Sequence, residues 1–310
     1  MALFSVILPV YNGGKYLQLS VESVLAQDFA DFEFVVLDDC STDGSYEYLQ
    51  TVQDHRFRLI RNERNMGLFY NLNRLVEITS GSLIKLWSQD DIMYPVCLSK
   101  MKAIHEKYPQ IGFSYSQRDI IDEHGNVSKR IVVDNTPELI STDLHALISF
   151  YTGSIAGNIA NVCIDRNVLL KTGPFREDMK ISADFDMWVR LAEHHPVGFS
   201  NEKLIQLRDH TGQLSRKESL YFYHVKEDME VFRYLLNYVK PGIRQEGKKL
   251  LRKHKFVFYY TLMIKSILKG DVNNGLKYFR ELKAADNIAM LTFSFVRGKI
   301  KPPSKPSFLN

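Results

Sequence analysis

Hydrophobic and polar positions follow two different periods along the first hundred residues. Continuous apolar runs bounded by polar residues are typical of strands that are buried on both faces of a sheet. They predict four strands, at residues 4–10, 32–37, 57–62 and 82–88. Between these runs, apolar residues recur every three or four positions, which predicts amphipathic helices. Strands that alternate with helices at this spacing indicate an α/β fold with a parallel sheet and right-handed crossovers.

The pattern changes after residue 110. Two further strands are expected, at 111–117 and 158–164. The sequence DEHGN, which follows the first of them, predicts a turn between two extended stretches. A helix with an apolar inward face is expected at 182–195, and from about residue 216 the pattern is helical. These changes divide the chain into three regions, 1–110, 111–215 and 216–310.

Charge is distributed unevenly between these regions. Residues 1–215 contain 20 Lys and Arg and 28 Asp and Glu, whereas residues 216–310 contain 20 and 8. The formal net charge of +4 therefore conceals an acidic body of −8 and a basic C-terminal region of +12. Such an asymmetry suggests that the C-terminal region meets an anionic partner or surface.

Composition and cysteine usage indicate a folded protein of a reducing compartment. Hydrophobic residues make up 45% and charged residues 25%, a balance that argues against a wholly disordered chain. Three scattered cysteines suit a cytosolic protein better than a disulfide framework. The sequence MALFSVILPVYN lacks a basic segment before its apolar run, so we expect a first strand there rather than a signal peptide. We therefore expect a cytoplasmic protein.

Polar clusters follow three of the predicted strands. The first strand ends in PVYNGG, the second in DDCSTD and the fourth in QDD. Ligands of open α/β sheets bind at the carboxyl ends of the strands, which meet at one edge when the strands are parallel. A divalent cation would relieve the repulsion between the adjacent carboxylates Asp90 and Asp91, because Mg²⁺ prefers oxygen ligands. A solvated turn would explain one such pair, but three polar strand ends at one edge favour a site.

The sequences that form these strand ends resemble a known family. SVILPVYNGGKYLQLSVESVLAQDFADFEFVVLDDCSTDGS, NERNMG and SQDD, in this order, are similar to the family 2 glycosyltransferases, which have the GT-A fold. The resemblance implies a nucleotide-sugar-binding half at 1–110 and an acceptor-binding and catalytic half at 111–215 of the same domain. Residues 216–310 would form a basic helical C-terminal region. The implied reaction is sugar transfer from a nucleotide-diphosphate-sugar, with UDP the commonest carrier, with inversion and with Mg²⁺ or Mn²⁺.

The resemblance assigns the donor site to the strand ends. Tyr11 would lie against the base, Asp39 would bind the base with Asp38 beside it, and Asp90 would contact the ribose or the donor sugar. Asp91 would bind the metal ion on the diphosphate, although the motif leaves open which carboxylate of the pair touches the metal. Backbone N–H groups of NERNMG suit phosphate or ribose contacts, but a plain helix cap would use the same residues. The expected donor nucleotide residues are Pro9, Tyr11, Asn12, Asp38, Asp39, Asn65, Gly67 and Asp90.

The expected catalytic base is also an aspartate. An inverting transfer needs a carboxylate that takes the proton of the acceptor hydroxyl. SADFDMWVRL resembles the family's Glu-Asp stretch, with Ala183 in place of the usual Glu, which implies Asp184 as the base and leaves Asp186 as the competing candidate. A carboxylate at a helix start would also suit the helix dipole without any catalytic role. LIQLRDHTGQLS resembles a family segment that would bring Arg208 and His210 to the diphosphate, with a polar loop as the alternative.

Other classes of function stay open at this point. The resemblance implies a saccharide or lipid-linked saccharide acceptor, in polysaccharide or glycoconjugate synthesis. A metal-dependent nucleotidyltransferase is disfavoured because PVYNGGKY lacks the arginine expected of its phosphate loop. A catalytically inactive nucleotide- or carbohydrate-binding module is disfavoured by the presence of the four aspartates Asp39, Asp90, Asp91 and Asp184.

The basic C-terminal region, residues 216–310, has its own expected partner. A basic, partly apolar helix is expected at 248–269, and such a helix can lie in the interface of an anionic membrane. This contact would place the protein at the inner membrane face. The same residues can instead pack on the catalytic domain or mediate dimerisation. We expect no nucleic-acid partner, because the body is acidic and no nucleic-acid-binding motif is present. The longest apolar run, 256–264, has nine residues, against the ~20 that span a bilayer.

Overall fold

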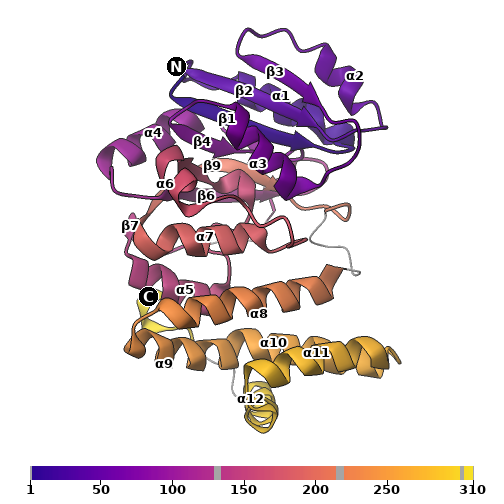
Figure 1. The fold of residues 1–310 in the computed structure, drawn as a ribbon, viewed down its shortest axis with the longest axis vertical. Coiled ribbons are helices and arrows are strands. Elements are labelled where there is room, and N and C mark those ends of the chain that lie inside the picture. The colour runs from indigo at the N-terminus through magenta and orange to yellow at the C-terminus, as the bar shows by residue number, and fades with distance from the viewer. Residues whose placement is uncertain (1, 129–133, 214–219, 301–303, 310) are drawn as a thin grey trace. The chain divides into compact units, whose positions relative to one another are not determined.

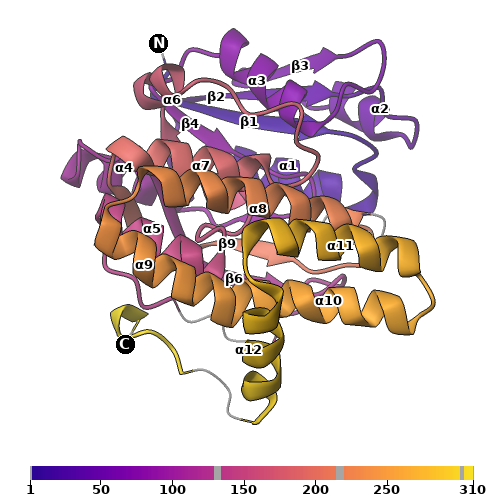
Figure 2. The same cartoon turned by 60° about the horizontal axis from the view of Figure 1, so that its bottom comes forward.

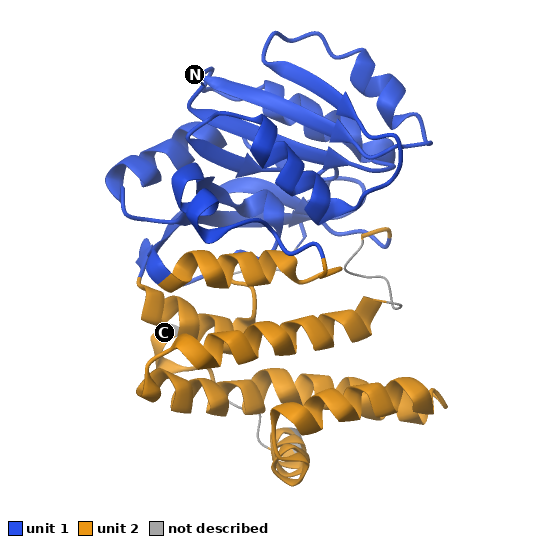
Figure 3. Ribbon diagram, in the orientation of Figure 1, with its two compact units in different colours: residues 1–140, 156–177, 194–211 blue, residues 141–155, 178–193, 212–310 orange. Residues whose placement is uncertain are grey.

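The computed structural model describes residues 2–128, 134–213, 220–300 and 304–309. It divides into two compact units, which Figure 3 shows in different colours. Unit 1 comprises residues 1–140, 156–177 and 194–211, and unit 2 comprises residues 141–155, 178–193 and 212–310. The chain passes between the units repeatedly, so each unit is assembled from segments that are distant in the sequence.

In the described residues, unit 1 is built on a nine-stranded sheet with the order β3-β2-β1-β4-β8-β6-β9-β5, and β7 pairs with β9 (Figure 1). Its strands are β1 (Phe4–Val10), β2 (Phe32–Asp38), β3 (Phe57–Arg61), β4 (Leu83–Leu86), β5 (Ile92–Met93), β6 (Phe113–Ile121), β7 (Leu139–Ile140), β8 (Cys163–Asp165) and β9 (Val197–Arg208). β1 is parallel to β2 and β4, and β2 is parallel to β3, which confirms the predicted parallel arrangement. β8 is antiparallel to both β4 and β6, so the sheet is mixed beyond β4.

The parallel strands are continuous apolar runs because helices and loops cover the sheet. Phe4, Val6 and Leu8 of β1 and Phe34 and Val36 of β2 are fully buried. Helix α3 contacts β1 and β2, and α4 contacts β6 and β9. The helical segments of unit 1 are η1 (Gly14–Tyr16), α1 (Leu17–Leu25), α2 (Ser45–Gln50), α3 (Leu68–Ile78), α4 (Cys97–Lys107), η2 (Ile159–Asn161) and α6 (Arg166–Thr172).

The structure differs from the strand predicted at 158–164. Ile159–Asn161 form the 3-10 turn η2, and the strand β8 comprises only Cys163–Asp165. Asn158 Oδ1 accepts the Ala160 N–H at 2.7 Å, and the Asn161 side chain exchanges hydrogen bonds with Ser116 of β6. Asn side chains that bond to nearby backbone groups favour turns over strands, so the apolar run forms a strand only at its end.

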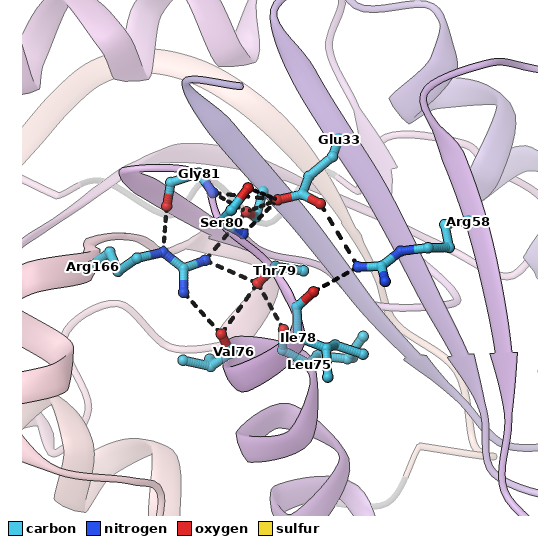
Figure 4. A network of polar contacts seen from close by, with 10 residues as sticks. Glu33, Arg58, Leu75, Val76, Ile78, Thr79, Ser80, Gly81 and Arg166 are labelled. Carbon is cyan, nitrogen blue, oxygen red and sulfur yellow. Dashed lines mark hydrogen bonds and ion pairs between the residues drawn. The ribbon is translucent and has the colours of Figure 1, made fainter. Parts of the chain in front are cut away.

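A polar network joins the amino ends of the parallel strands (Figure 4). Glu33 Oε1, at the start of β2, accepts hydrogen bonds from Ser5 Oγ of β1 at 2.7 Å and from the Ser80 N–H at 2.7 Å. The Arg166 guanidinium donates to the carbonyl oxygens of Gly81 and Val76, at 2.5 and 2.8 Å. These bonds hold the connection between α3 and β4 against the sheet. A Cβ on Gly81 would lie 2.4 Å from the Ser5 backbone nitrogen, so this close approach requires glycine.

Unit 2 is helical in its described residues. Its helices are α5 (Thr142–Thr152), α7 (Ala183–His194), α8 (Tyr221–Tyr238), α9 (Pro241–Leu250), α10 (Val257–Leu268), α11 (Val272–Ala285) and α12 (Ile288–Ile300), with the π-helical segment η5 (Leu251–Phe256) between α9 and α10 and the short turn η6 (Ser307–Leu309). Helix α7 lies along α8 (Figures 1 and 2), and the rings of Phe185 and Phe232 meet 5.5 Å apart between them. The helix predicted at 182–195 is confirmed, with Met187, Trp188 and Leu191 fully buried.

The helix expected at 248–269 is divided among α9, η5 and α10. Phe256, Tyr259, Tyr260 and Met263 are buried, and α10 packs against α11 and α12. These four residues of the apolar run therefore lie in the interior of unit 2, whereas Phe258 is 56% exposed. Within the part of the chain that the structure describes, no helix is both long and apolar enough to cross a membrane.

Candidate functional site

The loops that follow β1 and β2 are tied together at the carboxyl ends of these strands. The Asn12 N–H donates to Ser41 Oγ, and Asn12 Oδ1 accepts the Thr42 N–H, each at 2.9 Å. The Gly13 N–H donates to Ser45 Oγ at 2.9 Å. Asn12 has a φ of +50°, a left-handed conformation that Asn tolerates better than most residues. The loop after β1 therefore has a fixed shape.

Tyr11, the first residue of this loop, is hydrogen-bonded to the side-chain amide of Gln89. Tyr11 is 48% exposed although it directly follows a buried strand. Its N–H donates to Gln89 Oε1 at 2.9 Å, and its carbonyl oxygen accepts Gln89 Nε2 at 3.3 Å. Gln89 therefore connects the end of β1 to the Asp90–Asp91 pair. Pro9 lies one residue before the end of β1 and is half-buried.

Asp38 and Asp39, at the end of β2, are both buried. Asp39 accepts the Met66 N–H at 2.8 Å and the Gly67 N–H at 2.9 Å through its two carboxylate oxygens. Arg61 Nε lies 3.3 Å from Asp38 Oδ2. Asp38 Oδ1 accepts no hydrogen bond from the described residues. A buried oxygen without a donor is unfavourable, so a ligand with an N–H or O–H group would be stabilised here.

The start of α3 makes one of these contacts. Gly67 is the N-cap of α3 with a φ of +92°, a conformation that favours glycine. The Gly67 N–H, predicted to contact the donor, is bonded to Asp39, and Asn65 is exposed beside it. The end of β2 and the segment before α3 are thus linked through the Asp39 carboxylate.

Asp90 and Asp91 lie in the turn between β4 and β5. β5 pairs with β9 in antiparallel register, and this pairing brings Arg208, the last residue of β9, to the turn. The Arg208 N–H donates to Asp91 Oδ1 at 2.8 Å, and Arg208 Nε donates to the Asp90 carbonyl oxygen at 2.9 Å. Asn158 Nδ2 lies 3.4 Å from the other Asp91 oxygen. Asp91 is 0% exposed, whereas Asp90 is half-buried.

Burial and an adjacent like charge act on Asp91. Burial raises the pKa of Asp91 well above its ordinary value, and the neighbouring Asp90 charge raises it further, against the opposing effect of the Arg208 N–H. His210 Nε2 lies 3.0 Å from Asp90 Oδ2. The Tyr16 ring contacts the side chains of both Arg208 and His210, with the Arg208 guanidinium 4.4 Å and the His210 ring 5.0 Å from its centre. The structure thus brings Asp90, Asp91, Arg208 and His210 together.

The adjacent carboxylates of Asp90 and Asp91 fit a divalent cation. Carboxylate oxygens are ligands that Mg²⁺ and Mn²⁺ accept, and a cation would offset the repulsion by Asp90 that, after burial, raises the pKa of Asp91. The described residues contain no group of three or more His, Cys, Asp or Glu that could hold a metal ion by itself. Mg²⁺ is usually held through one or two carboxylates and completed by substrate phosphates and water, and the Asp90–Asp91 pair suits that mode.

Asp184 lies in unit 2, in the first turn of α7. Its side chain is half-buried and accepts the Phe185 N–H at 2.7 Å. Desolvation by burial, followed by the neighbouring Asp228 and Glu227 charges, raises the pKa of Asp184 to about 7. Asp186 is buried and its Oδ2 lies 2.7 Å from Arg190 Nε. Of the two candidate bases, Asp186 is therefore engaged in an ion pair, and Asp184 has the raised pKa.

Three residues of the site have no signal in the sequence. Asn158 was expected within a strand, and neither Tyr16 nor Gln89 was predicted to be a site residue. Each acts through a contact with a residue at least 67 positions away, since Asn158 and Asp91, Gln89 and Tyr11, and Tyr16 and Arg208 meet only in the folded sheet. A periodicity argument describes neighbours along one element and cannot predict such pairs.

Comparison with known proteins decides the family. Residues 5–170 match the family model described as Glycosyl transferase family 2. The chain belongs to glycosyltransferase family 2. An uncharacterized glycosyltransferase of Methanocaldococcus jannaschii is 31% identical over 231 residues, which are 72% of this chain and 77% of that protein. An uncharacterized glycosyltransferase of Rickettsia felis is 29% identical over 219 residues, or 70% of this chain but only 36% of that longer protein.

Solved structures confirm the fold of this family 2 glycosyltransferase. Residues 1–349 of Staphylococcus aureus TarS, in complex with UDP-GlcNAc, superpose with a TM-score of 0.71 at 17% identity, over 95% of this chain and 87% of that chain. The mannosyltransferase PcManGT of Pyrobaculum calidifontis, in complex with GDP-Man and Mn²⁺, gives a TM-score of 0.55 at 13% identity, over 97% and 81%. The α/β fold of GT-A type with C-terminal helices, predicted from the sequence, is confirmed.

Proposed function

We propose that this glycosyltransferase moves a sugar, with inversion, from a UDP-sugar to a saccharide or lipid-linked saccharide acceptor, in polysaccharide or glycoconjugate synthesis. The observation that carries the proposal is the meeting of Asp90 and Asp91 with Arg208 and His210 at the carboxyl edge of the sheet. A nucleotide diphosphate carries negative charge that needs cations, and the edge supplies a guanidinium, an imidazole and a carboxylate pair suited to a metal ion. The UDP-GlcNAc complex of TarS supports the choice of uridine.

The donor nucleotide would occupy the loops after β1 and β2. Tyr11 would stack on the base, because its exposed ring stands on a loop of fixed shape. Asp38 Oδ1, which accepts no bond from the described residues, and Asp39 would receive polar hydrogens of the base or ribose. Displacing the Gly67 N–H from Asp39 would leave that N–H for the ligand. The proposed set is Pro9, Tyr11, Asn12, Asp38, Asp39, Asn65, Gly67 and Asp90.

Asp91, with Asp90 and His210 beside it, would hold Mg²⁺ or Mn²⁺. When bound, the cation neutralises charge on the diphosphate leaving group, so no general acid is needed there. Arg208 would contribute further positive charge to the diphosphate, since its guanidinium is held over Tyr16 at the same edge. His210 would orient the Asp90 carboxylate through its Nε2 contact.

Asp184 would act as the base. In an inverting transfer the acceptor oxygen attacks the anomeric carbon as its proton passes to a carboxylate, and the diphosphate leaves with the electrons of the broken bond. A base works best when its pKa lies near the operating pH, and the pKa of Asp184 is about 7. The ion pair between Asp186 and Arg190 makes Asp186 the weaker candidate.

A binding and turnover experiment tests the proposed function. The melting temperature of the full chain is measured in Mn²⁺ with UDP, with GDP and without nucleotide. In a separate assay, nucleotide release is measured from a panel of UDP- and GDP-sugars. We expect UDP with Mn²⁺ to raise the melting temperature, because a ligand that binds only the folded state stabilises it, and we expect EDTA to abolish the shift and the turnover. Undiminished turnover in EDTA, or no response to any nucleotide of the panel, would contradict the proposal.

Paired substitutions test the base. Asp184→Asn keeps the shape and removes the basicity, so donor binding should persist while turnover falls by ~10²-fold or more. Asp186→Asn should retain far more turnover. The reverse result would show that Asp186 is the base and that the sequence similarity was aligned two residues off.

We also propose that unit 2 contacts an anionic membrane surface through α12. Met290, Phe293, Val296 and Ile300 are exposed on this helix at spacings of three and four residues, so they share one face. They lie in a region of 20 Lys and Arg against 8 Asp and Glu, and each cation near an anionic surface adds about 1 kcal/mol. Charge complementarity therefore favours anionic lipid over a second copy of this basic region.

Vesicle flotation tests this contact. The full chain should float with vesicles that contain anionic lipid, less so as salt screens the charges, and not with neutral vesicles. Phe293→Ser with Val296→Ser should reduce flotation, whereas Leu170→Ser, at an exposed apolar position of unit 1, should not. A dimer in solution that the α12 substitutions dissociate would instead assign this face to self-association.

A further inference from the structure

The segment that leads into α7 is held by a carboxylate from another helix. Glu227, in α8, is 5% exposed. Its Oε1 accepts the Lys180 N–H at 2.9 Å, and its Oε2 accepts the N–H groups of Ile181 at 3.0 Å and Ser182 at 2.9 Å. Three consecutive backbone N–H groups thus converge on one buried carboxylate. Hydrogen bonds to an ionised acceptor are stronger than those between neutral groups.

The next residue of α8 binds the same segment through a side chain. Asp228 Oδ1 accepts the Ser182 hydroxyl at 2.8 Å, and Asp228 Oδ2 accepts the Tyr259 hydroxyl of α10 at 2.5 Å. A serine before a helix commonly accepts a hydrogen bond from the first turn of that helix, but Ser182 donates to Asp228 here. The start of α7 is therefore stabilised by tertiary contacts, and both come from adjacent positions of α8.

We propose that Glu227 is a positioning residue for sugar transfer, which holds residues 180–182 in place and thereby fixes the carboxylate of Asp184. The inference rests on the proposed role of Asp184 as the base. Asp184 follows Ser182 by two residues, so a shift of the held segment moves the base. A displacement of about 1 Å at a reacting group can lower the rate by ~10²-fold. Glu227 itself contacts backbone N–H groups of this segment rather than substrate.

Glu227 also contributes to the charge that Asp184 experiences. Desolvation is the largest cause of the raised pKa of Asp184, and the Asp228 and Glu227 carboxylates raise it further, while the Phe185 N–H lowers it. Removal of the Glu227 charge should therefore move the rising limb of turnover to lower pH. Other titratable side chains on these elements include Lys180 before α7, which contacts Tyr223 of α8, Asp186 and Arg190 on α7, Lys255 in η5 and Tyr259 in α10.

The test compares Glu227→Gln with Glu246→Gln in the full chain. Glu246 is an exposed glutamate of α9, so its substitution makes the same change of charge away from the held segment. Amide hydrogen exchange of peptides that cover residues 180–186, kcat and KM for nucleotide release from UDP-GlcNAc with Mn²⁺, and the pH profile are measured. For Glu227→Gln we expect amide exchange to become faster by ~10-fold or more and kcat to fall by ~10-fold or more, with an unchanged KM. The rising limb of the pH profile of turnover should move to lower pH. Glu246→Gln should match the wild type.

The outcomes separate this inference from the proposed function. Wild-type exchange in Glu227→Gln would overturn the inference whatever the turnover, and so would faster exchange with unchanged kcat and pH profile, while Asp184→Asn would still decide the role of Asp184. If UDP-GlcNAc is not turned over, the carboxyl pKa of Asp184 in wild type and Glu227→Gln, measured by ¹³C NMR, replaces the kinetic readout, and equal values overturn the inference. If Glu227→Gln does not fold, Asp228→Asn is measured in the same way; it should show smaller changes in exchange and kcat, because it loses one bond to Ser182, and a limb that also moves to lower pH.

Discussion

The two ends of the parallel strands in unit 1 each carry a carboxylate, and the pKa values of these groups move in opposite directions. At the amino end, partial burial raises the pKa of Glu33, but hydrogen bonds from the Ser80 N–H, the Ser5 hydroxyl and the Gly81 N–H outweigh it, so the pKa is lowered. At the carboxyl end, burial and the Asp90 charge raise the pKa of Asp91 well above its ordinary value. The difference lies first in the depth of burial, and then in the number of donors and in the adjacent like charge.

This contrast shows which polar clusters mark a ligand site. In the amino-end network of Figure 4, N–H and O–H donors are bonded to carboxylate and carbonyl oxygens, so its role is to hold the loop before β4 on the sheet. The carboxyl end has two adjacent carboxylates, of which Asp91 is fully buried, and a buried Asp38 oxygen that accepts no bond from the described residues. Polar residues at a strand end therefore indicate a site where their charge and hydrogen bonds are incomplete.

The largest expected effect separates the two ends directly. Asp91→Asn removes the charge proposed to hold the metal ion, so turnover should fall by ~10³-fold or more, because a metal ion supplies several kcal/mol of charge stabilisation. Glu33→Gln, the same change of chemistry at the other end, should leave kcat within a factor of about two. Nucleotide release with Mn²⁺ measures both. Equal losses in the two variants would show that the ends do not differ in function.

The pH dependence extends the comparison to Asp184, whose pKa is also raised. If Asp184 is the base, turnover should rise about tenfold per pH unit below pH 7 and level off above it, because only the ionised form accepts a proton. A carboxyl whose folded pKa exceeds its unfolded value of 3.8 stabilises the fold below that value and loses this contribution as the pH rises through about 7. Asp184→Asn should therefore flatten both profiles between pH 4 and 7. A turnover limb that persists in Asp184→Asn would assign it to another group.

A substitution at the amino end should affect stability without catalysis. Arg166→Met removes donors to the Gly81 and Val76 carbonyl oxygens and to the Thr79 hydroxyl, so the free energy of unfolding should fall by about 2–4 kcal/mol. Urea denaturation measures the loss, and kcat at a temperature where the variant is folded should equal that of the wild type. Arg58→Met, at a more exposed position of the same network, should lose less than about 1 kcal/mol. A large fall in kcat of folded Arg166→Met would show that this end also acts in catalysis.

The smallest expected effect is the acid dependence of the amino-end network. The lowered pKa of Glu33 means that its stabilisation is present above the ordinary value of 4.5 and is lost as the pH falls through the folded value. Since Glu33 is partly exposed, Glu33→Gln should cost about 1 kcal/mol or less at pH 7. In urea denaturation, the difference from the wild type should shrink as the pH falls below 4.5 and vanish once Glu33 is protonated in the folded state. A difference that stays constant with pH would assign it to packing rather than charge.

The sequence predicted those site residues that directly follow a single strand. Apolar runs at 4–10, 32–37, 57–62 and 82–88 marked strands, and the polar residues after three of them were placed at one edge by the rule for parallel sheets. The order of the motifs then indicated the family. The strand expected at 158–164 was wrong in part because Asn158 and Asn161 bond to turn and neighbouring-strand atoms, which an apolar pattern does not reveal.

By itself, the sequence determined the parallel α/β core, the family and the aspartates that follow the strands. It could do so because a buried strand and the polar residues that follow it are consecutive in the chain. Only the tertiary structure decided which partners those aspartates and the segment before Asp184 have. The pairing of β5 with β9 brings the Arg208 N–H to Asp91, and α8 brings Glu227 to the segment before Asp184. These partners are separated by 117 and 45 positions, and their pKa values and charges depend on distance in space, which no local period of the chain encodes.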